Sequence, residues 1–192
     1  GRAIGLNPAA AEYHNNMGEA YRAQGKLDEA LARFQQALVL KPSMPEAHNN
    51  AGNILMEQGN LEEAIACYQR ALALNPNYAQ AHNNLGSALC EQGEPELVRA
   101  HYREALRIEP DRALWRLRME LLAPAVITDM DAVKRRHSQI EKALEDCPPI
   151  DLDRHLAELS TIDACPSFYL AYQGHNERPL RTKFARLFST PP

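Results

Sequence analysis

Three histidines at a fixed spacing are the first residues in the chain that suggest chemistry. His14, His48 and His82 lie 34 residues apart, and the imidazole of histidine is a common zinc ligand. Ligand atoms must approach a shared zinc ion to about 2 Å, whereas equivalent positions on neighbouring stacked helices are about 10 Å apart. The spacing therefore predicts three structural side chains, and we expect neither a metal ion nor a cofactor.

The sequence also lacks a recognisable catalytic group. It contains no G-x-S-x-G elbow, no phosphate-binding glycine loop and no H-E-x-x-H helix. The cysteines show neither a C-x-x-C pair nor a metal-like spacing. They are Cys67, Cys90, Cys147 and Cys165. We interpret all four as reduced thiols of a cytoplasmic protein, and we expect no catalytic residue in these 192 residues.

A repeated polar stripe is the feature that most strongly suggests binding. Steps of four and three residues place side chains on one face of a helix. The predicted members of the stripe are Glu12, Asn16, Glu19, Glu46, Asn50, Asn53, Gln80, Asn84 and Ser87. Asparagine is a modest helix former, so its return at one register favours a role in binding. Its amide both donates and accepts, which suits an extended peptide backbone. The alternative is that duplicated repeats simply copied their surface residues.

The stripe must be positioned by a helical repeat of 34 residues. Prolines at 8, 42, 76 and 110 share this period, and so do glycines at 18, 52 and 86 and at 25, 59 and 93. The first copy reads His14-x2-Met17-Gly18-x2-Tyr21, followed by Ala30-x3-Phe34 and by Pro42. This sequence resembles the tetratricopeptide repeat (TPR), a pair of antiparallel helices called A and B. The resemblance implies an all-α TPR solenoid, a right-handed superhelix whose concave groove carries the polar stripe.

The glycines and apolar residues have a physical place in such a repeat. Gly18, Gly52 and Gly86 are predicted to let helix A lie close to helix B. Gly25, Gly59 and Gly93 are predicted to end helix A in a left-handed conformation. Helix B then carries apolar side chains at i, i+3, i+4 and i+7, which face inward.

The period also sets the expected boundaries. Residues 11–44, 45–78 and 79–110 are predicted as three repeats, of which the last is atypical because Pro95, Val98 and Arg99 replace small or apolar residues. Terminal repeats commonly deviate in this way. Residues 1–8 resemble the end of a helix B, which predicts a further repeat upstream. Residues 111–192 are predicted to form a capping helix and a helical linker module.

The capping helix is expected to plug the end of the third repeat. It spans residues 113–122, with Leu114 and Trp115 facing inward. A longer helix is predicted to follow Thr128, which begins a capping-box pattern, and to pack through Val133 and Ile140. A last helix carries a basic face, interpreted as a solvated surface or as a docking surface for another domain. The residues of that face are Arg178, Arg181, Lys183 and Arg186.

Charge excludes some partners. Residues 11–110 hold 8 Lys and Arg against 13 Asp and Glu, and phosphate backbones are bound by clustered Lys and Arg. We therefore expect no nucleic-acid partner. No apolar run approaches the roughly 20 residues needed to cross a bilayer, so we expect no membrane partner either.

The C-terminal part resembles a more specific family. Residues 168–188, FYLAYQGHNERPLRTKFARLF, look like the stretch that precedes the catalytic domain in bacterial relatives of the SPINDLY and O-GlcNAc transferase glycosyltransferases. The resemblance implies that the chain is the substrate-binding arm of a protein O-glycosyltransferase, with a downstream catalytic domain as a further partner. It also implies that Asn16, Asn50 and Asn84 contact substrate peptides. No residue here matches the nucleotide-sugar site of that family.

A stand-alone TPR adaptor or co-chaperone is the alternative function. Co-chaperone repeats that clamp a C-terminal carboxylate need Lys or Arg on the groove face. The predicted stripe offers Asn, Glu, Gln and Ser instead, which disfavours the clamp.

Overall fold

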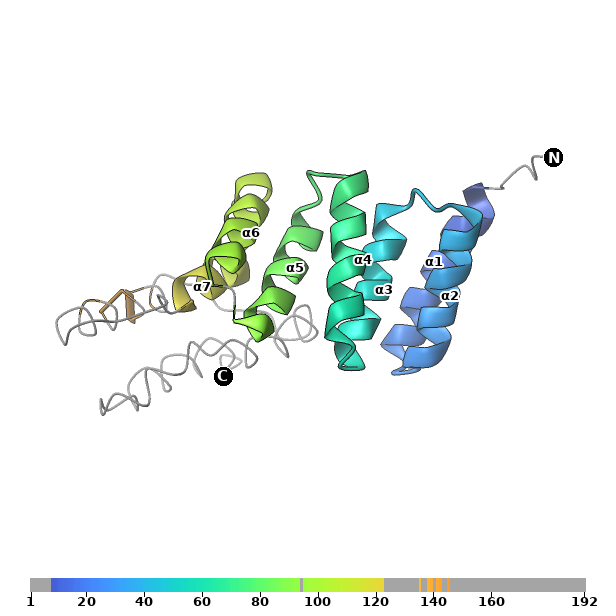
Figure 1. The fold of residues 1–192 in the computed structure, drawn as a ribbon, viewed down its shortest axis with the longest axis horizontal. Helices are drawn as coiled ribbons and strands as arrows, with labels where there is room; N and C mark the ends of the chain where they lie inside the picture. The colour runs from blue at the N-terminus through green and yellow to red at the C-terminus, as the bar shows by residue number, and fades with distance from the viewer. Residues whose placement is uncertain are drawn as a thin grey trace, which may run out of the picture. The chain divides into compact units, whose positions relative to one another are not determined.

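The computed structural model describes residues 8–93 and 95–122, together with 135, 138–139, 141–142 and 145. This part of the chain contains helices and no strand (Figure 1), and the isolated residues from 135 onward are also helical. The seven helices are α1 (Pro8–Ala23), α2 (Leu27–Leu40), α3 (Pro45–Glu57), α4 (Leu61–Leu74), α5 (Ala79–Gln92), α6 (Pro95–Ile108) and α7 (Ala113–Leu121). The all-α prediction is confirmed.

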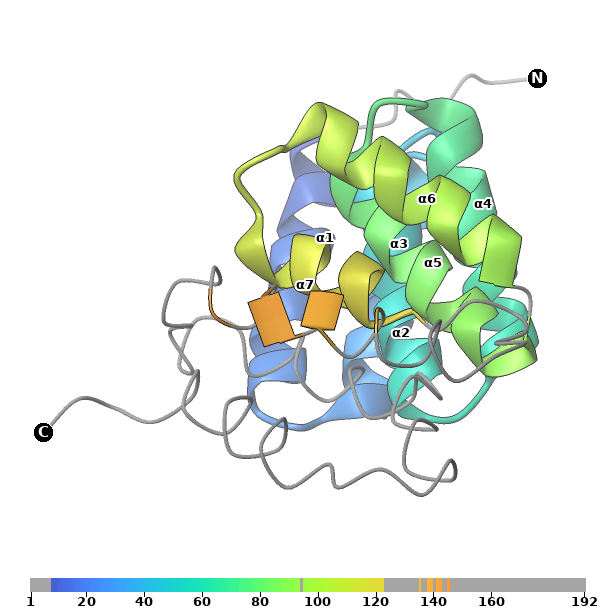
Figure 2. The same cartoon turned by 90° about the vertical axis from the view of Figure 1, so that its left-hand side faces the viewer.

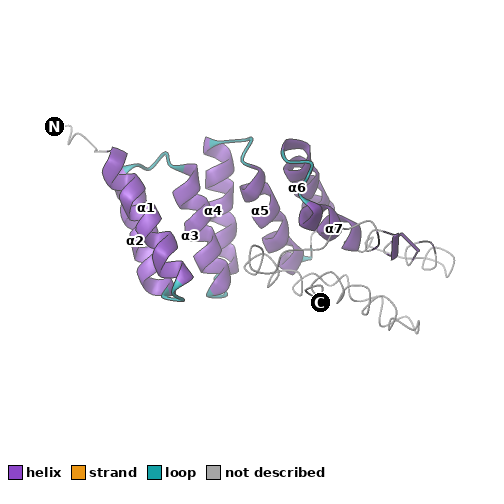
Figure 3. Ribbon diagram, turned by 180° about the vertical axis from the view of Figure 1, so that it is seen from behind, coloured by secondary structure: helices purple, strands orange, loops and turns teal. Residues whose placement is uncertain are grey.

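The chain divides into two compact units, residues 1–88 and residues 89–192, with the division inside α5. In the first unit, α1 packs against α2, α3 packs against α4, and α2 and α3 join the two pairs. Short teal loops separate the purple helices in Figure 3. Each helix A is therefore followed directly by its helix B, as the 34-residue pattern predicts.

Glycine allows helices A and B to approach each other. A Cβ atom at Gly18 would lie 2.6 Å from Cε1 of Phe34, and one at Gly52 would lie 2.6 Å from Cε1 of Tyr68. Real Cβ atoms do not come so close to a ring, so only glycine fits beneath these two aromatic side chains. The predicted role of Gly18 and Gly52 is confirmed.

A second glycine position turns the chain from helix A into helix B. Gly25, Gly59 and Gly93 have φ angles of +72°, +79° and +78°, which side chains with a Cβ disfavour. Nothing lies within 4 Å of a Cβ built at any of them. The conformation rather than the space therefore requires glycine, and the prediction of left-handed helix ends is confirmed.

The junction between repeats is held by a side chain six residues beyond each proline. Nε2 of His48 lies 3.0 Å from the carbonyl oxygen of Pro42, and Nε2 of His82 lies 3.0 Å from that of Pro76. In the second unit, Arg116 donates to the Pro110 carbonyl oxygen at 2.7 Å. These contacts give His48 and His82 a structural role at the turn from helix B to the next helix A.

The second unit has its own core around α6 and α7, which contact each other (Figure 2). Val98 and Tyr102 of α6 and Leu114 and Trp115 of α7 are buried, with Trp115 fully inaccessible. The guanidinium of Arg112 covers the Trp115 ring at 4.8 Å. The prediction that Leu114 and Trp115 face inward is confirmed.

Several other expectations lie outside the described residues. They concern residues 1–7, Thr128, Val133, Ile140 and the segment 168–188.

The prediction of four reduced thiols was wrong. Cys67 is free, but Cys90 is disulfide-bonded and nearly fully buried. The sequence spacing that excluded metal motifs could not reveal this bond, because disulfide formation depends on the distance between residues in the fold. The expectation of a cytoplasmic location rested on four reduced thiols. The disulfide at Cys90 therefore weakens the argument for that location.

Candidate functional site

The nine stripe residues lie on α1, α3 and the first ten residues of α5, all within the first unit. Their burial differs by repeat and by position. Four are exposed, namely Glu12, Asn16, Glu19 and Glu46. Four are half-buried, namely Asn50, Asn53, Gln80 and Asn84. Ser87 is buried, and its hydroxyl donates to the carbonyl oxygen of Asn83 at 3.1 Å.

The half-buried asparagines join neighbouring A helices. The amide nitrogen of Asn50 on α3 donates to Oδ1 of Asn15 at 3.2 Å and to Oε1 of Glu19 at 2.9 Å, both on α1. Both of its N–H groups are thus directed at the preceding repeat. We call this arrangement of one amide and two acceptors an asparagine rung.

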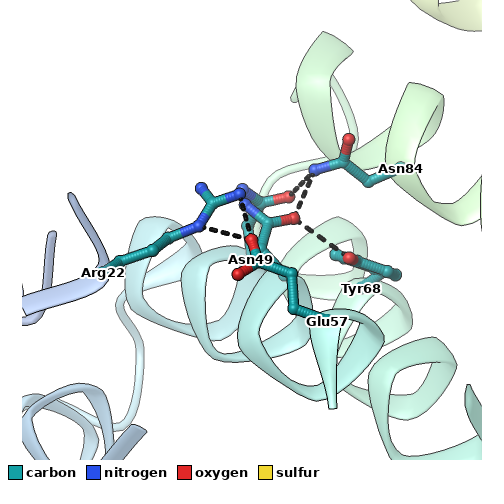
Figure 4. Close-up of polar contacts among 6 residues, drawn as sticks. Arg22, Asn49, Glu57, Tyr68 and Asn84 are labelled. Atoms are coloured by element: carbon teal, nitrogen blue, oxygen red, sulfur yellow. Dashed lines mark hydrogen bonds and ion pairs between the residues drawn. The ribbon is translucent and has the colours of Figure 1, made fainter. Parts of the chain in front are cut away.

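A second rung repeats the first one repeat later. The amide nitrogen of Asn84 on α5 donates to Oδ1 of Asn49 at 3.0 Å and to Oδ1 of Asn53 at 2.9 Å, both on α3. Tyr68 on α4 also donates to Oδ1 of Asn53 at 3.0 Å. Figure 4 shows the Asn84 nitrogen directed at these acceptors and its oxygen directed away from them. Burial raises the pKa of the Tyr68 hydroxyl, so it remains a donor at neutral pH.

Sequence reasoning missed the buried asparagines beside the stripe, two of which are rung acceptors. Asn15, Asn49 and Asn83 are 5%, 0% and 1% exposed, although each directly precedes a stripe asparagine. The signal was the doubled asparagine in each His-Asn-Asn triplet. Two adjacent helical residues point about 100° apart, so both cannot face the same solvent-filled groove.

An ion pair between repeats uses a cation that lies outside the stripe. The guanidinium of Arg22 on α1 is ion-paired with Oε1 of Glu57 on α3, through Nη2 at 2.6 Å and Nε at 2.8 Å. Glu12 and Glu46 pair with no residue that the structure describes, and Glu19 accepts only the amide of Asn50. The stripe itself contains no Lys or Arg, so it presents net negative charge.

A tyrosine from the α4–α5 junction approaches the same carboxylates. Burial, together with the negative charges of Glu46 and Glu19, raises the pKa of Tyr78 to about 12. The Tyr78 hydroxyl therefore remains protonated at neutral pH. Its position in the repeat is occupied by Met44 one period earlier, so the repeat pattern did not point to it.

The described residues hold neither a candidate metal site nor a candidate membrane span. Within them, no group of three or more His, Cys, Asp or Glu side chains is placed to hold a metal ion. None of the helices described is both long and apolar enough to cross a bilayer.

Comparison with known proteins identifies the repeat. A family model described as "TPR repeat" matches residues 18–58 and 52–93, and one described as "Tetratricopeptide repeat" matches residues 79–112. No curated protein matches the sequence significantly.

Solved structures share the fold at low sequence identity. MamA is 24% identical with a TM-score of 0.58, over 72% of this chain and 79% of that chain. The first TPR of Spaghetti (RPAP3), bound to the HSP90 peptide SRMEEVD, is 22% identical with a TM-score of 0.55, over 75% of this chain and 100% of that chain. The Arabidopsis OM64 TPR domain is 17% identical with a TM-score of 0.53, over 70% and 97%. These likenesses show the fold alone.

Proposed function

We propose that the chain is a protein-interaction scaffold whose polar stripe binds an extended peptide. The premise is that the chain is a tetratricopeptide-repeat protein with the predicted all-α solenoid fold. The observation that carries the proposal is the row of exposed carboxylates beside the asparagine rungs. Glu12 and Glu19 on α1 and Glu46 on α3 are exposed, and we expect an extended peptide that spans these two helices to lie beside all three carboxylates.

The rungs refine what each asparagine contributes. Because Asn50 and Asn84 direct their N–H groups at the preceding repeat, their side-chain oxygens are the atoms that accept hydrogen bonds from peptide N–H groups. The Asn84 oxygen also accepts a bond from the Asn83 amide at 3.3 Å, which leaves it one lone pair for a peptide. Each such bond adds only about 0.5–1.5 kcal/mol net. The exposed carboxylates must therefore supply much of the selectivity.

The charge of the stripe favours a neutral or basic peptide. The solved relative binds SRMEEVD, a peptide with more acidic than basic groups. On this chain, the same peptide would bring its carboxylates towards Glu12, Glu19 and Glu46 without a cation on the stripe to pair with them. This favours the peptide scaffold over the co-chaperone alternative.

The experiment removes charge and keeps an oxygen acceptor for the Asn50 rung, because glutamine at position 19 retains a side-chain carbonyl oxygen. Glu12→Gln, Glu19→Gln and Glu46→Gln together are expected to weaken binding of a fluorescent extended peptide with alternating Lys and Ser about tenfold, since each exposed ion pair is worth about 0.2–1 kcal/mol. Fluorescence anisotropy measures the Kd. Binding should also weaken with added salt.

A matched triple variant controls for overall charge. Glu29→Gln, Glu62→Gln and Glu63→Gln remove three exposed carboxylates from the helix B surfaces of the same unit. They should leave the Kd nearly unchanged. Equal weakening by both triple variants, or equally tight binding of SRMEEVD, would show that the stripe is not the binding surface.

We also propose that the scaffold serves a nucleotide-sugar-dependent protein O-glycosyltransferase. This rests on the sequence resemblance of residues 168–188 alone, since the family models stop at residue 112. The full-length protein is expected to transfer sugar from a nucleotide sugar to Ser or Thr of a peptide, and the 192-residue chain to transfer none. A full-length reading frame that encodes no nucleotide-sugar-binding domain would contradict this assignment and leave the scaffold proposal intact.

A further inference from the structure

Two asparagines of α3, Asn50 and Asn53, are held by opposite ends of their amides. They lie three residues apart, so their side chains share one face of the helix. Asn50 uses its nitrogen, which donates to Asn15 and to Glu19 on α1. A carboxylate can only accept hydrogen bonds, so the contact with Glu19 fixes which end of the amide faces α1. The Asn50 oxygen accepts no hydrogen bond from any residue that the structure describes.

Asn53 is held in the opposite sense. Its oxygen accepts from the Tyr68 hydroxyl at 3.0 Å and from the Asn84 amide at 2.9 Å, which uses both of its lone pairs. Its nitrogen donates to none of the described residues. The buried polar atoms that lack a partner belong to other residues, and Asn50 and Asn53 are only half-buried. One turn of α3 therefore presents a fixed acceptor and a fixed donor to solvent.

The neighbouring A helices do not repeat this fixed pair. On α1, Glu19 occupies the position of Asn53, and its carboxylate has no donor. On α5, Ser87 occupies that position, and its hydroxyl donates to the carbonyl oxygen of Asn83. Among the A helices of the first unit, the pair thus belongs to the second repeat alone.

We propose that Asn50 and Asn53 determine the specificity of the polar stripe by binding the main chain of one peptide residue. This inference rests on the proposed peptide-binding function. In an extended strand, the N–H and C=O groups of one residue point to the same edge. Asn50 accepts from that N–H group, and Asn53 donates to that C=O group. The partner is therefore an extended peptide whose residue at α3 carries a free N–H group, and proline or an N-methylated residue binds more weakly there.

The pair and the carboxylates contribute differently to binding. Four hydrogen bonds hold Asn50 and Asn53 in place before a peptide arrives, so little side-chain entropy is lost when it binds. Glu12 and Glu46 are exposed and pair with no described residue. They attract a basic peptide without fixing its position along the stripe. The asparagine pair fixes that position.

Asn53→Asp tests the donor without removing the acceptor. Aspartate keeps an oxygen for Tyr68 and Asn84 but replaces the N–H groups with a second oxygen. Gln80→Glu is the matched control, because it adds the same charge to the stripe from α5. We expect the Asn53→Asp chain to bind the fluorescent peptide of alternating Lys and Ser about fivefold more weakly than the Gln80→Glu chain does. An unchanged urea midpoint verifies that the variant is folded.

A modified peptide tests the acceptor on the natural chain. The same peptide with an N-methyl group on every residue keeps its charges and its C=O groups but has no main-chain N–H group. The natural chain is expected to bind it about fivefold more weakly than the unmodified peptide. The loss should be smaller for the Asn53→Asp chain, because a broken pair no longer holds the peptide residue at α3.

Two results would overturn the role of the pair. One is equal affinity of the Asn53→Asp and Gln80→Glu chains for the unmodified peptide. The other is equal affinity of the natural chain for the methylated and unmodified peptides. If the triple change of Glu12, Glu19 and Glu46 to Gln still weakened binding, the peptide scaffold would stand and only the pair would be rejected. If that triple change had no effect either, the scaffold proposal would fail as well.

Discussion

Tyr68→Ala is expected to lower the free energy of unfolding by about 3–5 kcal/mol, the range for a buried aromatic ring. The ring is 2% exposed and fills the space above Gly52. Its removal leaves a cavity between α3 and α4 and takes a donor from Asn53. Urea denaturation followed by circular dichroism at 222 nm measures the change.

Tyr68→Phe separates the ring from its hydroxyl. Phenylalanine retains the packing, and Asn53 still accepts the bond from Asn84, so the loss should be only about 0.5–1.5 kcal/mol. Tyr13→Ala removes an exposed tyrosine from the same unit and should change stability by less than about 0.5 kcal/mol. A loss for Tyr68→Ala no larger than that for Tyr13→Ala would contradict the packing described here.

Trp115→Ala is the second change with a large expected effect, again about 3–5 kcal/mol. The indole is fully buried between α6 and α7 and lies beneath the guanidinium of Arg112. Without it, the second unit loses its largest core side chain. Amide hydrogen exchange should show loss of protection in α6 and α7.

Trp115→Phe should be much milder. It keeps an aromatic ring, so the cavity is smaller than the one that alanine leaves. It also deletes the indole N–H, which has no hydrogen-bond partner among the described residues, and this partly offsets the cost of the cavity. Leu97→Ala, at an exposed position on α6, is the control for the same unit. Fast exchange in α6 after Leu97→Ala as well would mean that Trp115 has no special role.

The features that the sequence predicted depend on local geometry. Gly18 and Gly52 recur opposite an aromatic residue 16 positions later, and only the close approach of two helices requires that pair. Gly59 follows a helical run and precedes another, which is typical of a left-handed helix end. These patterns determine the structure within one repeat.

Features that join repeats were harder to predict. The sequence pattern placed Asn50 on a solvent-facing stripe, but its amide lies between two A helices and binds Asn15 and Glu19. The ion pair of Arg22 with Glu57 spans 35 residues and has no counterpart in the next repeat, because Met56 and Glu91 occupy those positions. A period shows which residues are equivalent, but it does not show which face of each helix meets its neighbour.

The two rungs have a consequence for how the gene can change length. In each rung, the donor lies 35 and 31 residues after its two acceptors, which is one more and three fewer than the 34-residue period. Removal of residues 45–78 would bring Asn84 into register with Asn15 and Glu19, and duplication of the same segment would create one more rung. An in-frame recombination event of one whole repeat therefore preserves this bonding, whereas insertions or deletions of other lengths break it.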